Sequence, residues 1–321
     1  MVLASTVDQD IAAPMVGAFY RVEGGKVSPK ARFGIRSDDH DALAAEVTGQ
    51  TDGFKADLIW SDDIFAIASL GRRGLLMPRS WGLEPEFPDS MRAADRTWRA
   101  FACTARVIMI NTDLVADLAP QPGSIDDLVN PLWAKRCGIA LPTTGSSASI
   151  HWGIIASKRG VDETARWYER VSANAVMMRS DAQVASAVAR GELDWGITGS
   201  NNAIVGVDEG KPVRILFPDQ APQSMGTVRI PLVVAVLKDA DHPVAGARFA
   251  DYLVSPDTED RLAMSDAANI PISRLATIRP RILGSEVIRW ADVDYEAAST
   301  AFEKLKVRWP TTGGHLIYLF R

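Results

Sequence analysis

The sequence predicts an α/β protein of two lobes, with a ligand cleft between lobes that are joined by two long crossing strands. Three observations predict this fold class. The chain has 321 residues, which exceeds the usual size of one domain. Strand and helix patterns alternate along it, which favours mainly parallel sheets covered by helices. Finally, the apolar segments 100–111 and 227–238 are each longer than a typical strand, and we expect them to connect the lobes.

The first block of elements occupies the N-terminal quarter of the chain. Short apolar runs predict strands, and apolar residues spaced three and four apart predict helices. Gly24 and Gly25 end the first helix, and Ser37 opens the second. In chain order we expect strand 2–6, helix 8–25, strand 30–35, helix 38–49, strand 56–60 and helix 63–74.

A second block follows the long strand 100–111. The same patterns predict strands at 137–141, 175–178, 194–198 and 213–217, and helices at 146–160, 162–174, 181–192, 243–255, 257–265 and 294–306. The polar segment 198–202 follows a buried strand and is interpreted as a loop. We therefore assign residues 1–104 and 231–285 to one lobe, and residues 105–230 and 286–321 to the other.

Composition restricts the class of protein. Apolar residues make up 47% of the chain and charged residues 23%, as in ordinary soluble proteins. The net charge of -5 gives no electrostatic basis for binding nucleic acid. The N-terminus has no signal-peptide pattern, so the sequence is either cytosolic or a mature form. Cys103 and Cys137 lack zinc-site spacing; buried free thiols are the simpler interpretation, and one disulfide stays open.

Ligands of open α/β sheets bind beyond the carboxyl ends of the strands, where helix N-termini offer free N–H groups. This rule selects loops that contain small, hydroxyl and acidic residues. The alternative is ordinary helix capping, which suits the segment 142–149 equally well and adjacent acids such as Asp62 and Asp63 better. The candidate ligand-binding residues are Thr6, Trp60, Asp62, Asp63, Arg106, Thr144, Gly145, Ser146, Ser147, Asp181, Asn201 and Asn202.

No pattern of catalytic residues is present. The sequence has no Gly-x-Ser-x-Gly, no His-Glu-x-x-His and no Walker loop. Cys103 lacks a local nucleophile signature, and His151 beside Trp152 is interpreted as a packed histidine. The sequence therefore predicts non-covalent binding and no enzymatic activity.

Segments in order along the chain carry a resemblance to a family. They include "STVDQDIAAPMVGAFYRVEGGKV", "ADLIWSDDIFAIASLGRRGLLMP", "SIDDLVNPLWAKRCGIALPTTGSSAS", "VASAVARGELDWGIT" and "GTVRIPLVVAVLKDADHPVAGARFADYLVSP". The chain resembles the periplasmic solute-binding proteins of ABC importers, in the type 2 group that contains the ferric-iron-binding proteins. This resemblance implies two α/β lobes, a ligand enclosed by hinge motion, and a membrane permease as partner.

The resemblance also implies roles for single residues. Asn201 and Asn202 stand where the ferric-binding relatives have two metal-chelating tyrosines, and amides are weak donors for Fe(III) compared with phenolates. Asp62 stands at the position of an acidic metal ligand, and the "PTTGSS" helix start at that of a synergistic anion. Arg106 is the one arginine where relatives have Arg-x-Arg, and Asp181 replaces a common Asn.

We therefore expect a monomeric solute-binding component of an ABC import system, located in the periplasm or tethered outside the membrane. Its ligand is a ferric or other metal ion, a metal complex or a small polar metabolite. No cofactor is expected beyond a bound metal ion, for which Asp62 is the candidate ligand. The alternative is a cytosolic ligand sensor or binding module of the same fold without transport. The segment 309–321 has no readable role.

Overall fold

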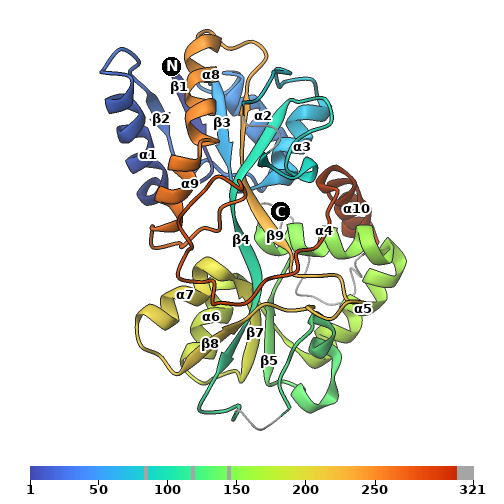
Figure 1. Cartoon of the computed structure of the whole chain (residues 1–321). Helices are drawn as coiled ribbons and strands as arrows, with labels where there is room; N and C mark the ends of the chain where they lie inside the picture. Colours follow the sequence, from blue (N-terminus) through green and yellow to red (C-terminus); the bar gives the residue numbers. More distant parts are fainter. Residues whose placement is uncertain (83–85, 117–119, 143–145, 309–321) are drawn as a thin grey trace. The chain divides into compact units, whose positions relative to one another are not determined.

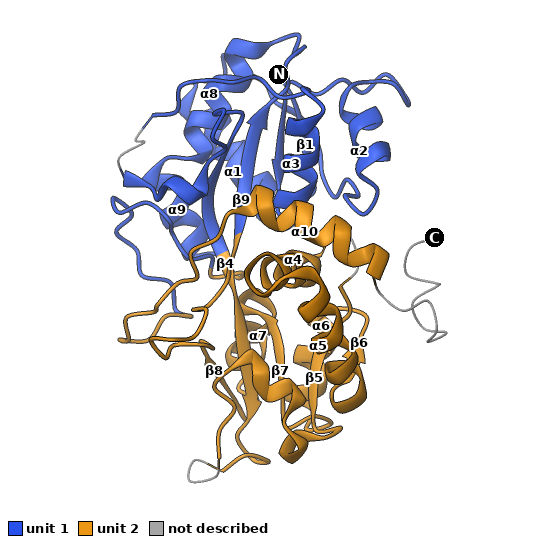
Figure 2. Ribbon diagram, turned by 90° about the vertical axis from the view of Figure 1, so that its right-hand side faces the viewer, with its two compact units in different colours: residues 1–103, 231–265, 269–281 blue, residues 104–230, 266–268, 282–321 orange. Residues whose placement is uncertain are grey.

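A computed structural model describes residues 1–82, 86–116, 120–142 and 146–308. The chain divides into two compact units (Figures 1 and 2). Unit 1 contains residues 1–103, 231–265 and 269–281, and unit 2 contains residues 104–230, 266–268 and 282–321. The chain passes from one unit to the other within the two long strands and again in the segment after residue 265.

Unit 1 is built on four strands in the order β2-β1-β3-β9. Strand β1 is parallel to β2 and β3, whereas β9 is antiparallel to β3. Helices pack beside this sheet and leave the ends of β1 and β3 next to one another. The elements of unit 1 are β1 (Val2–Ser5), α1 (Gln9–Val22), β2 (Lys30–Arg32), α2 (His40–Val47), β3 (Leu58–Ser61), α3 (Ile64–Arg72), η2 (Asp89–Met91), β9 (Arg229–Val236, which starts in unit 2), α8 (Pro243–Leu253) and α9 (Pro256–Ala263).

Unit 2 is built on the second half of a long strand, β4 (Trp98–Asn111). Strands β7 and β8 pair with it antiparallel, and β7 continues the sheet through the parallel strands β5 and β6. The elements of unit 2 are η3 (Ile125–Val129), η4 (Pro131–Trp133), β5 (Cys137–Ala140), α4 (Ser147–Arg159), α5 (Val161–Asn174), β6 (Val176–Met178), α6 (Asp181–Ala189), β7 (Trp195–Gly199), α7 (Ser200–Asp208), β8 (Val213–Leu216) and α10 (Tyr295–Arg308).

Aromatic packing fixes the helices of unit 2. The fully buried Trp152 of α4 lies 4.9 Å from the ring of Trp167 and 5.1 Å from that of Tyr168, both on α5. Helix α10 packs along α4 (Figure 2). Rings at these distances stabilise the contact beyond the apolar area that they bury. They hold α4, whose first residues contribute to the candidate site.

Strand β4 is irregular where unit 1 ends. Ala102 has a φ of 45°, a left-handed conformation that non-glycine residues rarely adopt. The fully buried Glu259 of α9 accepts the backbone N–H of Ala102 at 2.9 Å, and also those of Ile272 at 2.7 Å and Ser273 at 3.0 Å. A buried carboxylate thus holds the irregular strand segment against the loop that follows α9.

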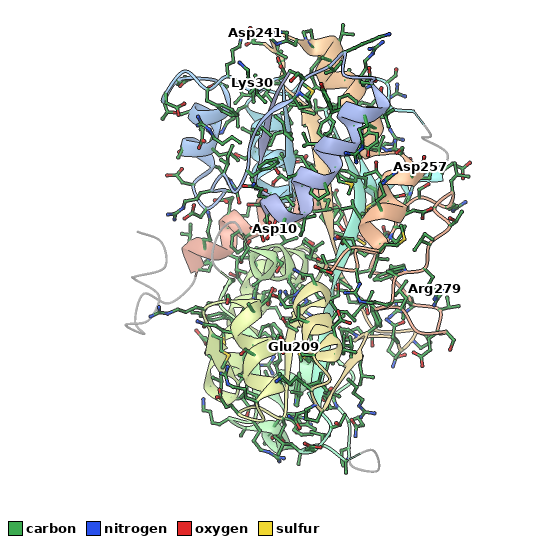
Figure 3. All side chains as sticks on the ribbon, turned by 90° about the vertical axis from the view of Figure 1, so that its left-hand side faces the viewer. Asp10, Lys30, Glu209, Asp241, Asp257 and Arg279 are labelled. Carbon is green, nitrogen blue, oxygen red and sulfur yellow. The ribbon has the colours of Figure 1, made fainter. Side chains whose placement is uncertain are left out.

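The structure corrects one element. Residues 198–202 are not a loop, because β7 continues through Gly199 and α7 begins at Ser200. The exposed charged side chains lie on helices, strands and loops of both units, among them Asp10, Lys30 and Glu209 (Figure 3). Among the described residues, no helix combines the length and apolar character needed to cross a membrane. Both cysteines are buried free thiols, as the simpler interpretation predicted.

Candidate functional site

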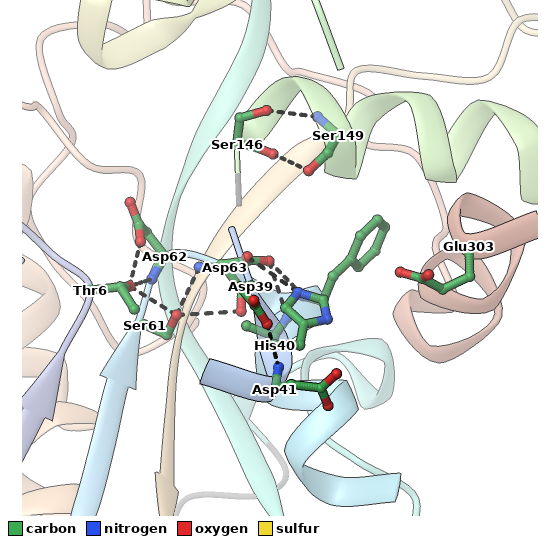
Figure 4. Close-up of polar contacts among 12 residues, drawn as sticks. Thr6, Asp39, His40, Asp41, Ser61, Asp62, Asp63, Ser146, Ser149 and Glu303 are labelled. Atoms are coloured by element: carbon green, nitrogen blue, oxygen red, sulfur yellow. Dashed lines mark hydrogen bonds and ion pairs between the residues drawn. The ribbon is translucent and has the colours of Figure 1, made fainter. Parts of the chain in front are cut away.

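Unit 1 presents a cluster of hydroxyl groups and a carboxylate, which we call the hydroxyl-acid cluster (Thr6, Ser61 and Asp62). Strands β1 and β3 are parallel neighbours, so Thr6 after β1 meets Asp62 after β3. The Thr6 hydroxyl donates to Asp62 Oδ1 at 2.6 Å and accepts the Asp62 backbone N–H at 3.1 Å. It also lies 2.9 Å from the Ser61 hydroxyl (Figure 4). The structure thus brings together two candidates that are 56 residues apart.

The surroundings of the Asp62 carboxylate disfavour its ionised form. Its residue is exposed. Desolvation by the surrounding protein raises the pKa of Asp62 to about 6, and the nearby carboxylates of Asp63 and Asp8 raise it further, whereas the hydrogen bond from Thr6 lowers it. A carboxylate that is both accessible and destabilised as an anion is suited to accept a proton, a ligand hydroxyl or a cation.

Asp63 has a structural role. Its Oδ1 accepts the backbone N–H groups of Phe65 at 3.0 Å and Ala66 at 3.2 Å, and it therefore caps α3. Asp63 is nearly fully buried. The alternative of helix capping is correct for this residue.

His40 was not among the predicted site residues, and it begins α2 directly after the capping residue Asp39. Its Nε2 lies 3.9 Å from Asp63 Oδ2, and neither of these buried atoms has a hydrogen-bond partner within the described ranges. No motif links the two residues, and only the turn signal at Asp39 marks the position of His40.

The side chain of Trp60 is enclosed by the protein. It is fully buried in β3, and its ring lies 5.7 Å from that of Phe101 in unit 1. The run Leu58, Ile59 and Trp60 is apolar on both faces of β3, which is typical of a central strand. The indole of Trp60 belongs to the core of unit 1, and a ligand contact by Trp60 stays a prediction.

Unit 2 holds a buried ion pair, which with one hydroxyl forms the Arg106 cluster (Arg106, Ser147 and Asp181). Arg106 is fully buried and Asp181 is 8% exposed. Arg106 Nη1 donates to Asp181 Oδ2 and, at 3.2 Å, to the Ser147 hydroxyl. The Ser147 hydroxyl donates its proton to the same Asp181 Oδ2. Three predicted site residues from β4, α4 and α6 therefore form one hydrogen-bonded group.

Three helices of unit 2 begin at the Arg106 cluster. Ser147 is the first residue of α4 and Asp181 the first of α6, and Ser146 and Ser180 cap these helices. Helix α7 begins after Gly199, which is paired in register with Arg106. Because the N-terminus of a helix carries partial positive charge, three such ends and a guanidinium would together attract an anion. The carboxylate of Asp181 already occupies that position.

Helix α7 is held to β4 by a side-chain bond. Ser200 Oγ accepts the backbone N–H of Ala105 at 3.0 Å, and the Thr198 hydroxyl donates to the backbone carbonyl of Asp181 at 2.9 Å. No side chain caps α7 at Gly199. Asn201 and Asn202 therefore lie in the first turn of a helix whose N–H groups are not covered by a cap, and both side chains are half-buried.

The Arg106 cluster retains unused hydrogen-bonding capacity. Arg106 Nε and Nη2 and Asp181 Oδ1 are buried atoms without a hydrogen-bond partner in the part of the chain that the structure describes. His151, also fully enclosed, has a pKa well below its ordinary value because of burial and then the positive charges of Arg106 and Arg159. His151 is therefore neutral, as expected for a packed histidine.

Two candidates, Thr144 and Gly145, lie outside the described residues. Of the same segment, Ser146 caps α4 by accepting the backbone N–H of Ser149 at 3.1 Å, and Ser147 belongs to the Arg106 cluster. Across the ranges that are described, no group of three or more His, Cys, Asp and Glu side chains is placed to hold a metal ion.

A comparison with protein families decides the identity. The profile of the family described as bacterial extracellular solute-binding protein matches residues 14–264. The chain belongs to this family. It is a solute-binding protein by family, and its relatives and structural neighbours are binding proteins rather than enzymes.

Relatives of the solute-binding protein include transport proteins for iron. It is 24% identical to iron uptake protein A1 of Synechocystis over 73% of this chain and 68% of the relative. It is 26% identical to the major ferric iron-binding protein of Neisseria meningitidis over 58% of this chain and 54% of that protein. The similarity thus covers about half to two thirds of these relatives.

Solved structures support the fold over nearly the whole chain. The ferric binding protein from Campylobacter jejuni matches with a TM-score of 0.82 at 18% identity, over 98% of this chain and 99% of that one. The periplasmic binding protein AfuA from Actinobacillus pleuropneumoniae, solved with fructose-6-phosphate, matches with a TM-score of 0.77 at 18% identity, over 96% and 97%. These matches confirm the predicted two-lobe, type 2 fold.

Proposed function

We propose that this solute-binding protein captures a small polar organic solute without covalent chemistry and delivers it to an ABC permease. The candidate contact residues are given for each unit by itself: Ser147, Asn201 and Asn202 in unit 2, and Thr6 and Asp62 in unit 1. The solute bears hydroxyl or amide groups, because the available groups are hydroxyls, amides and one weakly acidic carboxyl. The description of the family as extracellular supports a periplasmic or tethered location.

The buried ion pair of Arg106 and Asp181 is the observation that supports this proposal best. The half-buried Ser147 at the start of α4 is hydrogen-bonded to the pair, and α7, which contains Asn201, begins after Gly199, the residue paired in register with Arg106. Protein interiors seldom bury such a pair without a specific role, because desolvating the charges is costly. Polar groups that converge at helix N-termini are typical of sites for small polar ligands.

The pair Asn201 and Asn202 argues against a bare ferric ion as the cargo. Fe(III) prefers hard anionic oxygen donors, and amide oxygens are neutral. An amide group instead offers one acceptor and two donors, which suits hydroxyl groups of an organic molecule. Asn201 and Asn202 therefore do not support the binding of iron that the names of the relatives indicate for those proteins.

Freshly purified protein analysed by native mass spectrometry and elemental analysis tests this proposal. An organic molecule that co-purifies in stoichiometric amount would support it. Thermal unfolding with a panel of sugars, polyols, polyamines, phosphonates and ferric citrate should then show stabilisation by one class, since ligand at 100 times Kd adds about 2.7 kcal/mol. Absence of any co-purifying molecule together with no stabilisation by the panel would contradict the proposal.

The exposed carboxylate of Asp62 favours a second candidate, a metal ion bound as a complex with a small organic ligand. Here Asp62 would supply one oxygen to the metal, and the organic ligand would supply the others. Stoichiometric iron that persists after purification, and that Asp62→Asn releases, would support this candidate over a metal-free solute.

A further inference from the structure

We propose that Asp181 is a built-in counter-ion that makes the Arg106 cluster reject multiply charged anions such as phosphate. This inference rests on the proposed function, since it narrows the class of solute that the same residues accept. It assigns to Asp181 the role of a specificity-determining residue that competes with an anion, rather than that of a residue that holds the solute.

The geometry places the carboxylate where an anion would otherwise bind. Asp181 Oδ2 receives both the Arg106 guanidinium and the Ser147 hydroxyl. A hydroxyl has a single proton to donate. The Ser147 proton is therefore used inside the protein, and Ser147 can only accept a hydrogen bond from a ligand.

The charge balance follows from the same contacts. Arg106 and the N-termini of α4, α6 and α7 contribute positive charge, and Asp181 at the start of α6 compensates the guanidinium. A phosphate that approached this group would face a buried carboxylate at close range, where like charges repel strongly. A neutral hydroxylated group meets no such penalty.

Three polar atoms of the Arg106 cluster remain available for hydrogen bonds to a solute of low charge. Arg106 Nε and Nη2 and Asp181 Oδ1 have no hydrogen-bond partner among the residues described, and all three are buried. They comprise two donors and one acceptor. That combination matches a hydroxyl or a water molecule, which both donates and accepts, and does not match phosphate, which mainly accepts.

The decisive variant is Asp181→Asn, which removes the negative charge and keeps the shape. Inorganic phosphate is the probe, titrated by calorimetry and by thermal unfolding at constant ionic strength. We expect no detectable phosphate binding by the unchanged protein, and at least a tenfold gain in phosphate affinity in Asp181→Asn. A folded Asp181→Asn protein without any gain, or tight phosphate binding by the unchanged protein, would overturn the inference.

Two control variants isolate the cause. Glu192→Gln changes the net charge of unit 2 equally, but Glu192 is exposed and pairs with Arg190 on the surface. Ser147→Ala removes the hydroxyl and leaves the carboxylate in place. Neither should gain phosphate affinity. A gain of the same size in Glu192→Gln would mean that overall charge, and not Asp181, excludes phosphate.

If Asp181→Asn does not fold, two other measurements still test whether Asp181 excludes phosphate. Asp181→Ala frees space beside Arg106, and phosphate should raise its melting temperature while chloride at equal ionic strength should not. The phosphate titration of the unchanged protein needs no variant at all, and saturable binding there contradicts the inference. Solute capture is measured separately by native mass spectrometry, so its failure is distinguishable from failure of the phosphate result.

Discussion

The two units place polar groups at strand ends in opposite physical states. In unit 1 the Asp62 carboxylate of the hydroxyl-acid cluster is exposed, and no cation is among the causes of its shifted pKa. In unit 2 the Arg106 cluster is buried, and its carboxylate is paired with a guanidinium. Both groups contain residues that were selected by the same rule, namely that ligands bind beyond the carboxyl ends of strands. The two carboxylates differ in their partners: Asp62 is desolvated without a nearby cation, whereas Asp181 is desolvated beside the guanidinium of Arg106.

This difference predicts which property of the protein changes when residues of each unit are substituted. An unpaired carboxylate near the surface can relieve its penalty by taking up a proton, so its effects depend on pH. A buried ion pair has no such route, so removing one partner strands the other charge. Variants in unit 2 should therefore affect stability and specificity most, and variants in unit 1 should affect pH dependence.

The largest effect is expected for Arg106→Met. The variant leaves Asp181 as a buried, uncompensated charge, so the free energy of unfolding should fall by about 3–5 kcal/mol. Urea denaturation at pH 7 measures this. The double variant Arg106→Met with Asp181→Leu should recover much of the loss, because two apolar side chains of similar size need no charge partner.

The surface pair of Arg190 and Glu192 supplies the control for Arg106→Met. Both side chains are more than half exposed, so Arg190→Met should cause a much smaller loss. Equal losses for Arg106→Met and Arg190→Met would show that burial does not distinguish the two ion pairs.

The next effect concerns solute affinity rather than stability. The double variant Asn201→Ala with Asn202→Ala removes two half-buried amides from the first turn of α7. Loss of one or two hydrogen bonds should weaken binding of the co-purifying solute about tenfold, or about 1.4 kcal/mol. Calorimetry measures the affinity, and Glu209→Gln after the end of α7 is the matched control. Unchanged affinity in the double variant would remove these residues from the site.

A smaller effect is expected for Asp63→Ala in unit 1. Its carboxylate caps α3, so the free energy of unfolding should fall by about 1 kcal/mol, and Asp63→Asn should keep most of the cap. Chemical denaturation of both variants checks this. A large loss of solute affinity in Asp63→Asn with normal stability would instead assign Asp63 to the binding residues.

Most of the fold was predictable because its elements carry strong local patterns. The apolar run of β3 and the helix-period residues of α5 each predict one element from one short segment. Helix α7 was missed because its first residues, Ser200 to Asn202, are polar and favour turns in short windows. Its helical state is fixed instead by neighbours, including the hydrogen bond between Ser200 and Ala105.

The candidate site was predictable as a set of strand ends but not as a set of contacts. The loops that contain Thr6 and Asp62 follow neighbouring strands, so their proximity follows from a parallel sheet. Arg106 and Asp181 are 75 residues apart, and neither spacing nor motif indicates that they pair. Adjacency in sequence did not reveal that Asp63 caps α3 or that the Trp60 side chain enters the core.

The sharpest separation of the units is expected for Asp62→Asn, whose effect on stability changes with pH. The pKa of Asp62 in the folded protein is about 6, above its ordinary value of 3.8, so the folded state binds this proton more tightly than the unfolded state. Stability from this group is therefore present at pH 4 and is lost as the pH rises to 6. Asn cannot ionise, so Asp62→Asn should match the unchanged protein at pH 4 and become the more stable of the two above pH 6.

Asp38→Asn is the control for this pH profile, because the hydrogen bond from Arg36 lowers the pKa of Asp38. The sign is then reversed: its stabilising effect is present above the ordinary carboxyl pKa and is lost in acid. Urea denaturation from pH 4 to pH 8 should show Asp62→Asn gaining stability relative to the unchanged protein as the pH rises, whereas the difference for Asp38→Asn should stay nearly constant, because the effect of Asp38 is lost only below its ordinary pKa of 3.8. Parallel profiles for both variants would mean that Asp62 is an ordinary surface carboxylate, and the contrast between the two units would then rest on the Arg106 cluster alone.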